Sequence, residues 1–284
     1  MQTFINQLGE LTGTMILILI GNGVCFSVSH SKMFANQPGK WIVIALAWGI
    51  AVFMGVTVAS AIGAPGHLNP AVSVYAAITE GVKVDPFLFK YFGYIPFQIV
   101  GAMIGQSILN FINWKFIIAT AAEDPGATRG AHCTNPAFDN KADKATVRNF
   151  SYELVGTFAL IILVDSFGRI PSFPNLGPIG VMLVVMGIGM ALGSATGYAI
   201  NPARDLGPRI VYAIMRPFIM RKAGVEIEKA NWSYAWVPVI APLLGGLLMG
   251  GFGLINSPLQ PKPATEIAAD VKNFFQLPAY QLAF

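Results

Sequence analysis

Two short stretches decide the fold, and they share a three-residue core: His67-Leu68-Asn69-Pro70-Ala71 and Ala199-Ile200-Asn201-Pro202-Ala203. Asparagine is a strong N-cap residue, and proline is favoured at the first helical position, where its missing N–H is not needed. Each stretch therefore predicts the start of a helix. The apolar segments that contain them, 67–79 and 199–214, are too short to cross a bilayer core, which requires about 20 helical residues.

The rest of the chain is strongly apolar. Of its 284 residues, 54% are hydrophobic and 11% are charged, whereas soluble domains carry about 25% charged residues. Five long stretches have no acidic or basic residue, and in a sixth, 149–168, only Glu153 and Asp165 are charged. We therefore expect an all-α polytopic membrane protein with spans at about 8–29, 41–62, 87–110, 148–169, 177–197 and 233–256.

Several classes of protein are excluded by the remaining composition. A net charge of +4 gives no reason to expect nucleic-acid binding, and two cysteines do not make a disulfide framework. The sequence has no His/Cys metal spacing, no phosphate-binding glycine loop with a lysine, and no nucleophile paired with a base. We expect no catalytic residues, metal or cofactor, hence no enzyme. The N-terminal apolar run lacks a basic leader, so a cleaved signal peptide is not expected.

The chain contains an internal repeat. Glu10-Leu11-Thr12-Gly13-Thr14 recurs as Glu153-Leu154-Val155-Gly156-Thr157, in step with the two Asn-Pro-Ala stretches. Each half has three spans and one half-span, so the second half must enter the membrane in the opposite orientation. We expect one domain, 1–256, made of inverted repeats at about 8–110 and 148–256 that are joined by loop 111–147. The tail, 257–284, is expected to be peripheral.

A third copy, Asn135-Pro136-Ala137, precedes a polar segment that no half-span could use, so we assign it to an exposed turn. The other two half-helices, if they begin near mid-membrane, bring their positive dipole ends together and repel cations. Asn69 and Asn201 can each cap a helix with the side-chain oxygen and still offer the NH₂ group to a passing hydroxyl.

The longer stretches Gly66-His67-Leu68-Asn69-Pro70-Ala71-Val72 and Gly197-Tyr198-Ala199-Ile200-Asn201-Pro202-Ala203-Arg204-Asp205 resemble the two signature loops of the major intrinsic proteins, or aquaporins. Asp205 directly after Arg204 resembles the aquaglyceroporin, or glycerol uptake facilitator, branch. The resemblance covers roughly 8–256. It implies six transmembrane helices, two re-entrant half-helices and one pore per protomer. It also implies a homotetramer in the cell membrane with both termini cytoplasmic.

The resemblance also implies a selectivity filter formed by Trp48, Gly189, Tyr198 and Arg204. Trp48 would supply an apolar wall, Gly189 would leave room beside the aromatic rings, and Arg204 would donate to solute hydroxyls and repel cations. From the residues alone, Trp48 could instead be a packing residue and Arg204 could snorkel to the surface. Tyr198 departs from the family pattern, in which phenylalanine is usual, and its hydroxyl makes the slot more polar or narrower.

Four further residues have two interpretations each. Glu10 and Glu153 could be a proton relay in a secondary carrier, or, as the resemblance implies, acceptors for backbone N–H groups of the re-entrant loops. His67 could gate ions or line the pore with its carbonyl. Asp205 could favour the N-terminus of its helix or, by resemblance, position the Arg204 loop and widen the pore.

We expect a passive channel for glycerol and other small uncharged polyols, with some water permeability. One alternative is a channel for neutral lactic acid, since the external loops of the implied topology, 30–40, 111–148 and 209–232, hold twelve basic residues against six acidic ones and a cationic vestibule concentrates anions. The same charges contradict the positive-inside rule. A proton-coupled carrier is the other alternative.

Overall fold

The computed structural model describes residues 2–81, 92–169 and 176–256, and every regular element in these ranges is a helix. The all-α class predicted from the sequence is confirmed. In chain order, the elements are α1 (Gln2–Ser29), α2 (Lys40–Ile62), α3 (Pro70–Gly81), α5 (Tyr94–Ile112), α6 (Trp114–Glu123), α7 (Ala127–Gly130), α8 (Thr146–Arg169), α9 (Pro178–Ala191), η1 (Gly193–Ala195), α10 (Pro202–Ala223), α11 (Trp232–Ala235) and α12 (Val237–Asn256).

Among the described residues, 5 helices are long and apolar enough to cross a membrane: α1, α2, α5, α8 and the continuous stretch Trp232–Ile255. They match five of the predicted spans, although residues 87–91 of the third lie outside the described residues. The remaining span, 177–197, was predicted too long, because α9 has only 14 residues. Beyond Ala191 the chain enters the 3-10 turn η1, and just after this turn the N–H of Gly197 donates to the carbonyl of Gly193 at 2.8 Å.

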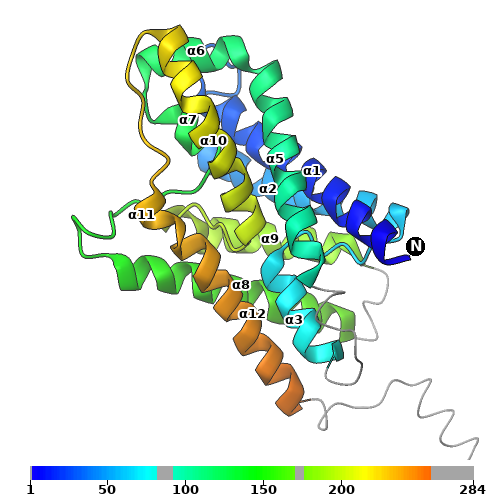
Figure 1. Ribbon diagram of the computed structural model, residues 1–284. Coiled ribbons are helices and arrows are strands. Elements are labelled where there is room, and N and C mark those ends of the chain that lie inside the picture. The colour runs from blue at the N-terminus through cyan, green and yellow to red at the C-terminus, as the bar shows by residue number, and fades with distance from the viewer. Residues whose placement is uncertain (1, 82–91, 170–175, 257–284) are drawn as a thin grey trace, which may run out of the picture.

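The two half-helices pack across the molecule. Within the first part of the chain α1 packs against α2 and α5, and in the second part α8 packs against α9 and α12. The short helix α3 lies mainly against α12, while α10 lies against α5. Each half-helix therefore contacts a span from the other half of the sequence, and this exchange brings the two Asn-Pro stretches to the centre of the molecule (Figure 1).

Small residues permit close approach at matched places in the two halves. A Cβ added at Gly101 of α5 would overlap the carbonyl oxygen of Leu11 on α1, and one at Gly245 of α12 would lie 3.2 Å from the carbonyl oxygen of Leu154 on α8. Leu11 and Leu154 each follow one of the repeated glutamates. The helices that carry Glu10 and Glu153 are thus held tightly by equivalent glycine contacts.

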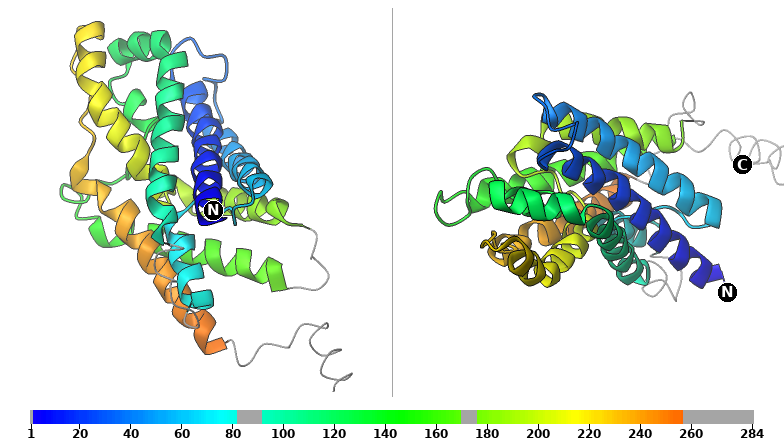
Figure 2. Two further views of the ribbon diagram at one scale, coloured as in Figure 1. Left: turned by 45° about the vertical axis from the view of Figure 1, so that its right-hand side comes forward. Right: turned by 90° about the horizontal axis from the view of Figure 1, so that it is seen from above.

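The helices α3 and α10 run in opposite directions from the centre, as Figures 1 and 2 show from two sides. The predicted start of each at Asn-Pro is correct, since α3 begins at Pro70 and α10 at Pro202. The second short segment was predicted to end at residue 214, and this prediction was wrong. α10 has 22 residues and continues to Ala223, with Pro208 and Pro217 inside it, until Gly224 adopts a left-handed conformation (φ 72°).

The basic residues that sequence analysis placed in the loop 209–232 lie mostly on this helix: Arg209, Arg216, Arg221 and Lys222. The connection 111–147 was predicted to be a loop, but it contains the end of α5 and the helices α6 and α7. The predicted peripheral tail, 257–284, lies outside the described residues.

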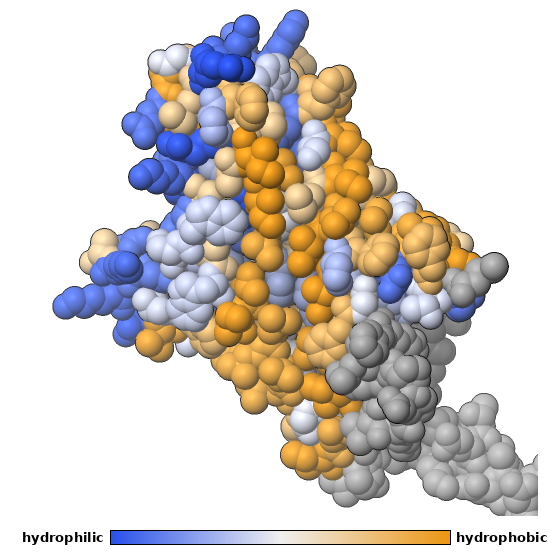
Figure 3. Space-filling model, in the orientation of Figure 1, coloured by the Kyte–Doolittle hydropathy of each residue, from blue (hydrophilic) through white to orange (hydrophobic). Residues whose placement is uncertain are grey.

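The outer surface shows where lipid would lie. Apolar side chains cover the middle of the face in Figure 3, and polar side chains gather at one end, over α6, α10 and the adjoining loops. Large apolar side chains on this outer surface include Phe111 and Ile240, which are exposed by 83% and 48%. In a water-soluble domain such patches would be unfavourable, whereas a bilayer accommodates them.

Candidate functional site

The two asparagines of the repeated stretches meet at the centre of the molecule and bond crosswise. The Asn69 side-chain NH₂ donates to the carbonyl of Ile200, and that of Asn201 donates to the carbonyl of Leu68, each at 2.8 Å. The Asn69 side-chain oxygen accepts from the Ala71 N–H at 2.9 Å. An amide NH₂ has two hydrogens, so each asparagine can cap its own helix, bind the opposite loop and still serve a solute.

The Asn201 side-chain oxygen caps α10 in the same way, by accepting from the N–H groups of Ala203 at 3.0 Å and Arg204 at 3.2 Å. The α10 helix therefore starts with a saturated N-cap. This crosswise pair of asparagines, together with the starts of α3 and α10, is called the asparagine junction below.

The backbone before each asparagine is strained in the same pattern. Leu68 and Ile200, directly before the asparagines, have φ of 52° and 42°. Three residues before each asparagine, Gly66 and Tyr198 have φ of 73° and 34°. For residues other than glycine this left-handed region costs on the order of 1–3 kcal/mol. Such strain persists only where the surroundings hold the backbone.

The repeated glutamates hold these strained segments. The two carboxylate oxygens of Glu10 accept from the N–H groups of His67 and Leu68, both at 2.7 Å. Those of Glu153 accept from the N–H groups of Ala199 at 3.0 Å and Ile200 at 2.8 Å. Both glutamates are fully buried. The peptide N–H groups are therefore occupied from behind, and the carbonyls of the same peptides stay available to a solute.

The first carboxylate has additional support that sequence reasoning missed. Gln98 on α5 donates to Glu10 at 2.8 Å and to Ser73 Oγ at 3.0 Å. The hydroxyl of Ser73 also lies 3.1 Å from Nδ1 of His67. His67 is thus tied to α3 through its ring and to α1 through its backbone, which favours a structural role for its side chain.

The four residues assigned to a selectivity filter come together. Cζ of Arg204 lies 3.9 Å from the centroid of the Trp48 ring, a cation–π distance. Arg204, Trp48 and Tyr198 are each at most 6% exposed, so Arg204 does not snorkel to the surface. A Cβ added at Gly189 would lie 2.9 Å from Cζ and Oη of Tyr198. Glycine is therefore the residue that leaves space for the tyrosine ring.

A neighbouring tryptophan completes this group. Nε1 of Trp41 donates to the carbonyl of Gly189 at 3.0 Å, and its ring packs edge-on against Tyr198 with centroids 5.8 Å apart. The hydroxyl of Tyr198 is buried and has no hydrogen-bond partner within the described part of the chain. Trp41 was not predicted, although its position seven residues before Trp48 places both rings on one face of α2.

Trp48, Tyr198, Arg204 and the two asparagines line one cavity of about 270 Å³. Its wall combines the asparagine junction, three of the filter residues and apolar side chains from α1, α2, α8 and α9. The lining residues include Trp48, Asn69, Tyr75, Leu160, Ile161, Val164, Asp165, Val181, Val185, Tyr198, Asn201 and Arg204. The wall is therefore amphipathic, with a few polar groups set in aliphatic surface.

Asp205 has partners that sequence analysis did not predict. It pairs with Arg209 one turn later at 2.7 Å, and both side chains are fully buried. It also accepts from the N–H and hydroxyl of Thr134, at 3.1 and 2.9 Å, while Arg209 donates to the Thr134 carbonyl at 2.8 Å. Asp205 therefore anchors the inter-repeat connection beside Arg204. The i,i+4 spacing of Asp205 and Arg209 is the signal that could have revealed the pair.

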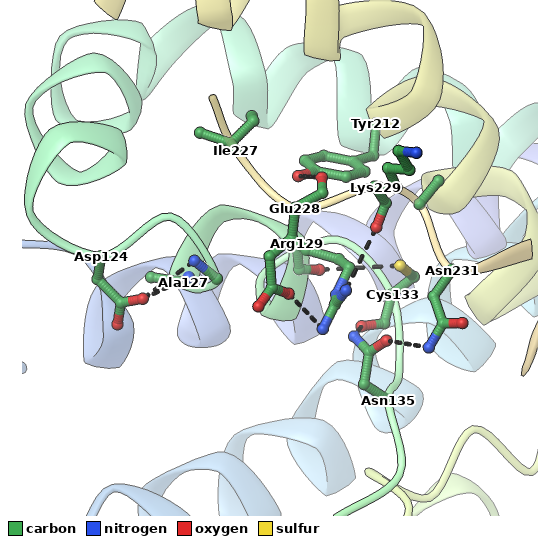
Figure 4. Close-up of polar contacts among 12 residues, drawn as sticks. Asp124, Ala127, Arg129, Cys133, Asn135, Tyr212, Ile227, Glu228, Lys229 and Asn231 are labelled. Carbon is green, nitrogen blue, oxygen red and sulfur yellow. Dashed lines mark hydrogen bonds and ion pairs between the residues drawn. The ribbon is translucent and has the colours of Figure 1, made fainter. Parts of the chain in front are cut away.

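The inter-repeat connection also bonds to the segment between α10 and α11 (Figure 4). Arg129 forms an ion pair with Glu228 and donates to the Lys229 carbonyl at 3.3 Å. Asn231 donates to the side chain of Asn135 at 3.3 Å. The third Asn-Pro-Ala copy lies in this loop, as predicted, and the N–H of Ala137 donates to the carbonyl of Ala195 in η1 at 2.9 Å.

The chain is similar to known proteins along most of its length. The family model described as "Major intrinsic protein" matches residues 2–252. A probable glycerol uptake facilitator protein of Mycoplasmoides gallisepticum is 42% identical over 261 residues, which cover 90% of this chain and 99% of that relative. A glycerol uptake facilitator protein of Streptococcus pneumoniae is 41% identical over 240 residues, covering 84% and 94%. The X-ray structure of the aquaglyceroporin from Plasmodium falciparum superposes with a TM-score of 0.67 at 27% identity, covering 90% and 98%.

Proposed function

Because the chain belongs to the major intrinsic protein family, we propose that it is a passive transmembrane channel for glycerol and other small uncharged solutes. Relatives at 41–42% identity are named glycerol uptake facilitators, and one structural neighbour is an aquaglyceroporin. The chain is a multi-pass membrane channel and not an enzyme.

The asparagine junction inside an amphipathic cavity is the observation that carries this function. A glycerol molecule has hydroxyls along one edge and carbons along the other. In the cavity its hydroxyls would meet the NH₂ groups of Asn69 and Asn201 and the guanidinium of Arg204. Its carbon edge would lie against Trp48, Tyr198 and the aliphatic side chains. These contacts replace the hydrogen bonds that glycerol gives up when it leaves water, and this replacement lowers the free-energy barrier to entry.

Exclusion of ions follows from the same groups. The N-termini of α3 and α10 point toward each other, and each carries about half a positive charge. Arg204 adds a full charge at the filter. A cation or a proton-carrying water chain would meet this field at the asparagine junction, where Glu10 and Glu153 do not compensate it because they are bonded to the loops behind the cavity.

Two alternatives lose support. A proton-coupled carrier would need carboxylates free to bind and release protons, whereas Glu10 and Glu153 are each held by two backbone N–H groups. A cationic vestibule for lactate is weakened because Arg209, one of the counted basic residues, is fully buried and paired with Asp205, which lies outside the counted loops. The names of the relatives also favour glycerol.

Water is proposed as a secondary permeant, since a cavity that admits glycerol has room for water. We also propose a homotetramer with one pore in each protomer, located in the cell membrane with both termini cytoplasmic. The inter-repeat connection and the far end of α10 would then lie outside. The count of basic residues opposes this orientation under the positive-inside rule, and membership of the family supports it.

The test is a permeability panel of water, glycerol, urea and lactic acid in proteoliposomes at pH 4–7. Glycerol flux well above that of empty vesicles, with little change across pH, is expected. Lactic acid flux that exceeded glycerol flux and followed the protonated fraction would instead favour the organic-acid channel.

A further inference from the structure

Trp41 lies behind the filter and contacts two of its residues. It is the second residue of α2, and its side chain is partly buried. Its indole N–H donates to the carbonyl of Gly189 at 3.0 Å, and its ring meets the Tyr198 ring edge-on, with planes inclined at 67°. The described residues that line the cavity include Tyr198 but not Trp41. Any effect of Trp41 on a solute is therefore transmitted through Gly189 and Tyr198.

The indole N–H caps the end of α9. Gly189 is the third residue from the end of this helix, which stops at Ala191 and is followed by the 3-10 turn η1. Carbonyls in the last turn of an α-helix generally have no donor within the helix. Trp41 supplies a donor from the start of α2, and the two helices pack against each other along their length. The backbone of Gly189 is therefore held at a fixed place beside the filter.

The Tyr198 ring packs directly on glycine backbone at the end of α9. A Cβ added at Gly189 would lie 2.9 Å from Cζ of Tyr198, and one at Gly193 would lie 2.6 Å from its Cδ1. The Cβ at Gly193 would also lie 3.0 Å from Cζ2 of Trp41, so the two aromatic rings meet over this glycine. Because Trp41 does not line the cavity, the space that its ring occupies lies outside the conduction path. Trp41 therefore blocks one direction in which the Tyr198 ring could withdraw from the slot.

We propose that Trp41 is a positioning residue that sets the width of the filter. This inference rests on the proposed glycerol channel. The edge-on contact restrains the Tyr198 ring, and the bond to Gly189 holds the backbone on which that ring packs. With both contacts in place, the ring does not withdraw when a larger solute arrives. Trp41 thereby favours three-carbon over five-carbon polyols without touching either of them.

The experiment compares the permeability of five-carbon sugar alcohols with that of glycerol in the same proteoliposomes. Trp41→Leu removes the ring and the N–H, so the Tyr198 ring gains room outside the cavity. We expect the five-carbon-to-glycerol ratio to rise about threefold, within the range that corresponds to loss of one aromatic pair. Trp41→Phe keeps a ring and removes only the N–H, so its ratio should rise by a smaller factor.

The matched control is Trp236→Leu. Trp236 packs against the ring of Phe150 with centroids 5.7 Å apart, nearly the same separation as in the pair of Trp41 and Tyr198. It is not among the described residues that line the cavity. The control therefore removes an equivalent aromatic contact at a distance from the filter, and it should leave the five-carbon-to-glycerol ratio unchanged.

A double variant separates positioning from general loosening of the fold. Gly189→Ala alone places a methyl group against the Tyr198 ring and narrows the slot. Adding Trp41→Leu gives the displaced ring room outside the cavity, so glycerol permeability should recover toward that of the wild type. Two substitutions that only damaged the fold would lower glycerol permeability further. If Trp41→Leu does not yield monodisperse protein, the polyol ratio of Trp41→Phe decides the question.

The possible failures are distinguishable. Wild-type glycerol flux no greater than that of empty vesicles would reject the proposed function, and the role of Trp41 with it. Wild-type conduction with an unchanged five-carbon-to-glycerol ratio in both Trp41 variants would leave the channel in place and overturn the positioning role. The same conclusion would follow if Trp236→Leu raised the ratio as much as Trp41→Leu, or if the double variant showed no recovery of glycerol permeability.

Discussion

Glu10 and Glu153 hold equivalent positions on either side of the asparagine junction, each accepting at 2.7–3.0 Å from the backbone N–H groups of the two residues that directly precede an asparagine. This relationship explains how two short loops with left-handed residues stay folded in the middle of a membrane protein. The carboxylates supply acceptors for peptide groups that no helix could satisfy.

Replacing Glu153 by glutamine should destabilise the channel. The new NH₂ group would face a backbone N–H, so one hydrogen bond to a charged acceptor is lost, at a cost of about 2–3 kcal/mol. Thermal unfolding in detergent should report this loss. Glu226→Gln is the matched control, because Glu226 is 78% exposed. Unchanged stability combined with loss of proton-driven uptake would instead indicate a carrier.

Widening the filter should relax selectivity. Trp48→Ala and Tyr198→Ala each remove a ring from the cavity wall, so larger polyols such as five-carbon sugar alcohols should pass faster relative to glycerol. The rate of vesicle swelling with each polyol measures this. An unchanged polyol profile in both variants would locate the filter elsewhere.

Arg204→Ala should weaken exclusion of charged permeants. The substitution removes the guanidinium stacked on Trp48 and with it the full positive charge next to the α10 N-terminus. Proton leakage, followed with a pH-sensitive dye inside the vesicles, should rise above that of the wild type. A leak equal to the wild type would assign proton exclusion to the helix N-termini alone.

Gly189→Ala should narrow the slot. The new methyl group would lie 2.9 Å from the Tyr198 ring, too close for carbon contact, so the ring must move into the cavity. Glycerol permeability should fall about tenfold, while water permeability should fall less because water needs a smaller opening. Gly187→Ala is the control, since a Cβ there meets no atom within 4 Å. Equal losses for both solutes would point to misfolding.

Much of the site could be predicted because its chemistry is local in sequence. Asn-Pro marked the starts of α3 and α10, the polar residues after the third copy marked it as a loop, and the matched glutamates marked the repeat. Contacts between distant segments carried no such signal. Gln98 supports Glu10 from a residue 88 positions away, and Thr134 joins Asp205 across 71 positions. A single sequence does not show which distant polar residues meet.

The ends of helices were the least predictable feature. The second half-helix was predicted within the apolar segment 199–214, but α10 passes Pro208 and Pro217 and ends at Ala223, before Gly224. The bonds of Arg209 to Asp205, one turn earlier in the same helix, and to the carbonyl of Ala230 outside it stabilise the helix where its local propensity is poor. Tertiary packing thus outweighed proline, and an arginine expected in a loop is fully buried.

The pair Asp205–Arg209 should be important for stability. Asp205→Ala leaves a buried guanidinium without its carboxylate, which costs about 3–5 kcal/mol. Glu226→Ala breaks the ion pair between Glu226 and Arg216. Because the Glu226 carboxylate is exposed, this change should cost about 0–1 kcal/mol. Unfolding temperatures of the two variants check the contrast. Similar small effects would mean that Arg209 is held by its backbone partners alone.

Acid should destabilise the fold through two buried histidines, His30 directly after α1 and His132 in the inter-repeat connection. Burial lowers the pKa of His132 to about 3 and that of His30 to about 4 from the ordinary value of 6.5. Both stay neutral when folded but gain protons when unfolded, so the stability they contribute is present above pH 6.5 and declines as the pH falls below it. The unfolding temperature should decrease between pH 7.5 and pH 4.5, and less so in His132→Gln.

The central claim is that the chain conducts glycerol passively through the asparagine junction. The most direct measurement is the initial rate of glycerol entry into proteoliposomes over a wide concentration series, with and without a proton gradient. A passive channel predicts a rate that rises linearly with concentration and is the same in both conditions. A rate that saturates and increases with an inward proton gradient would contradict the account.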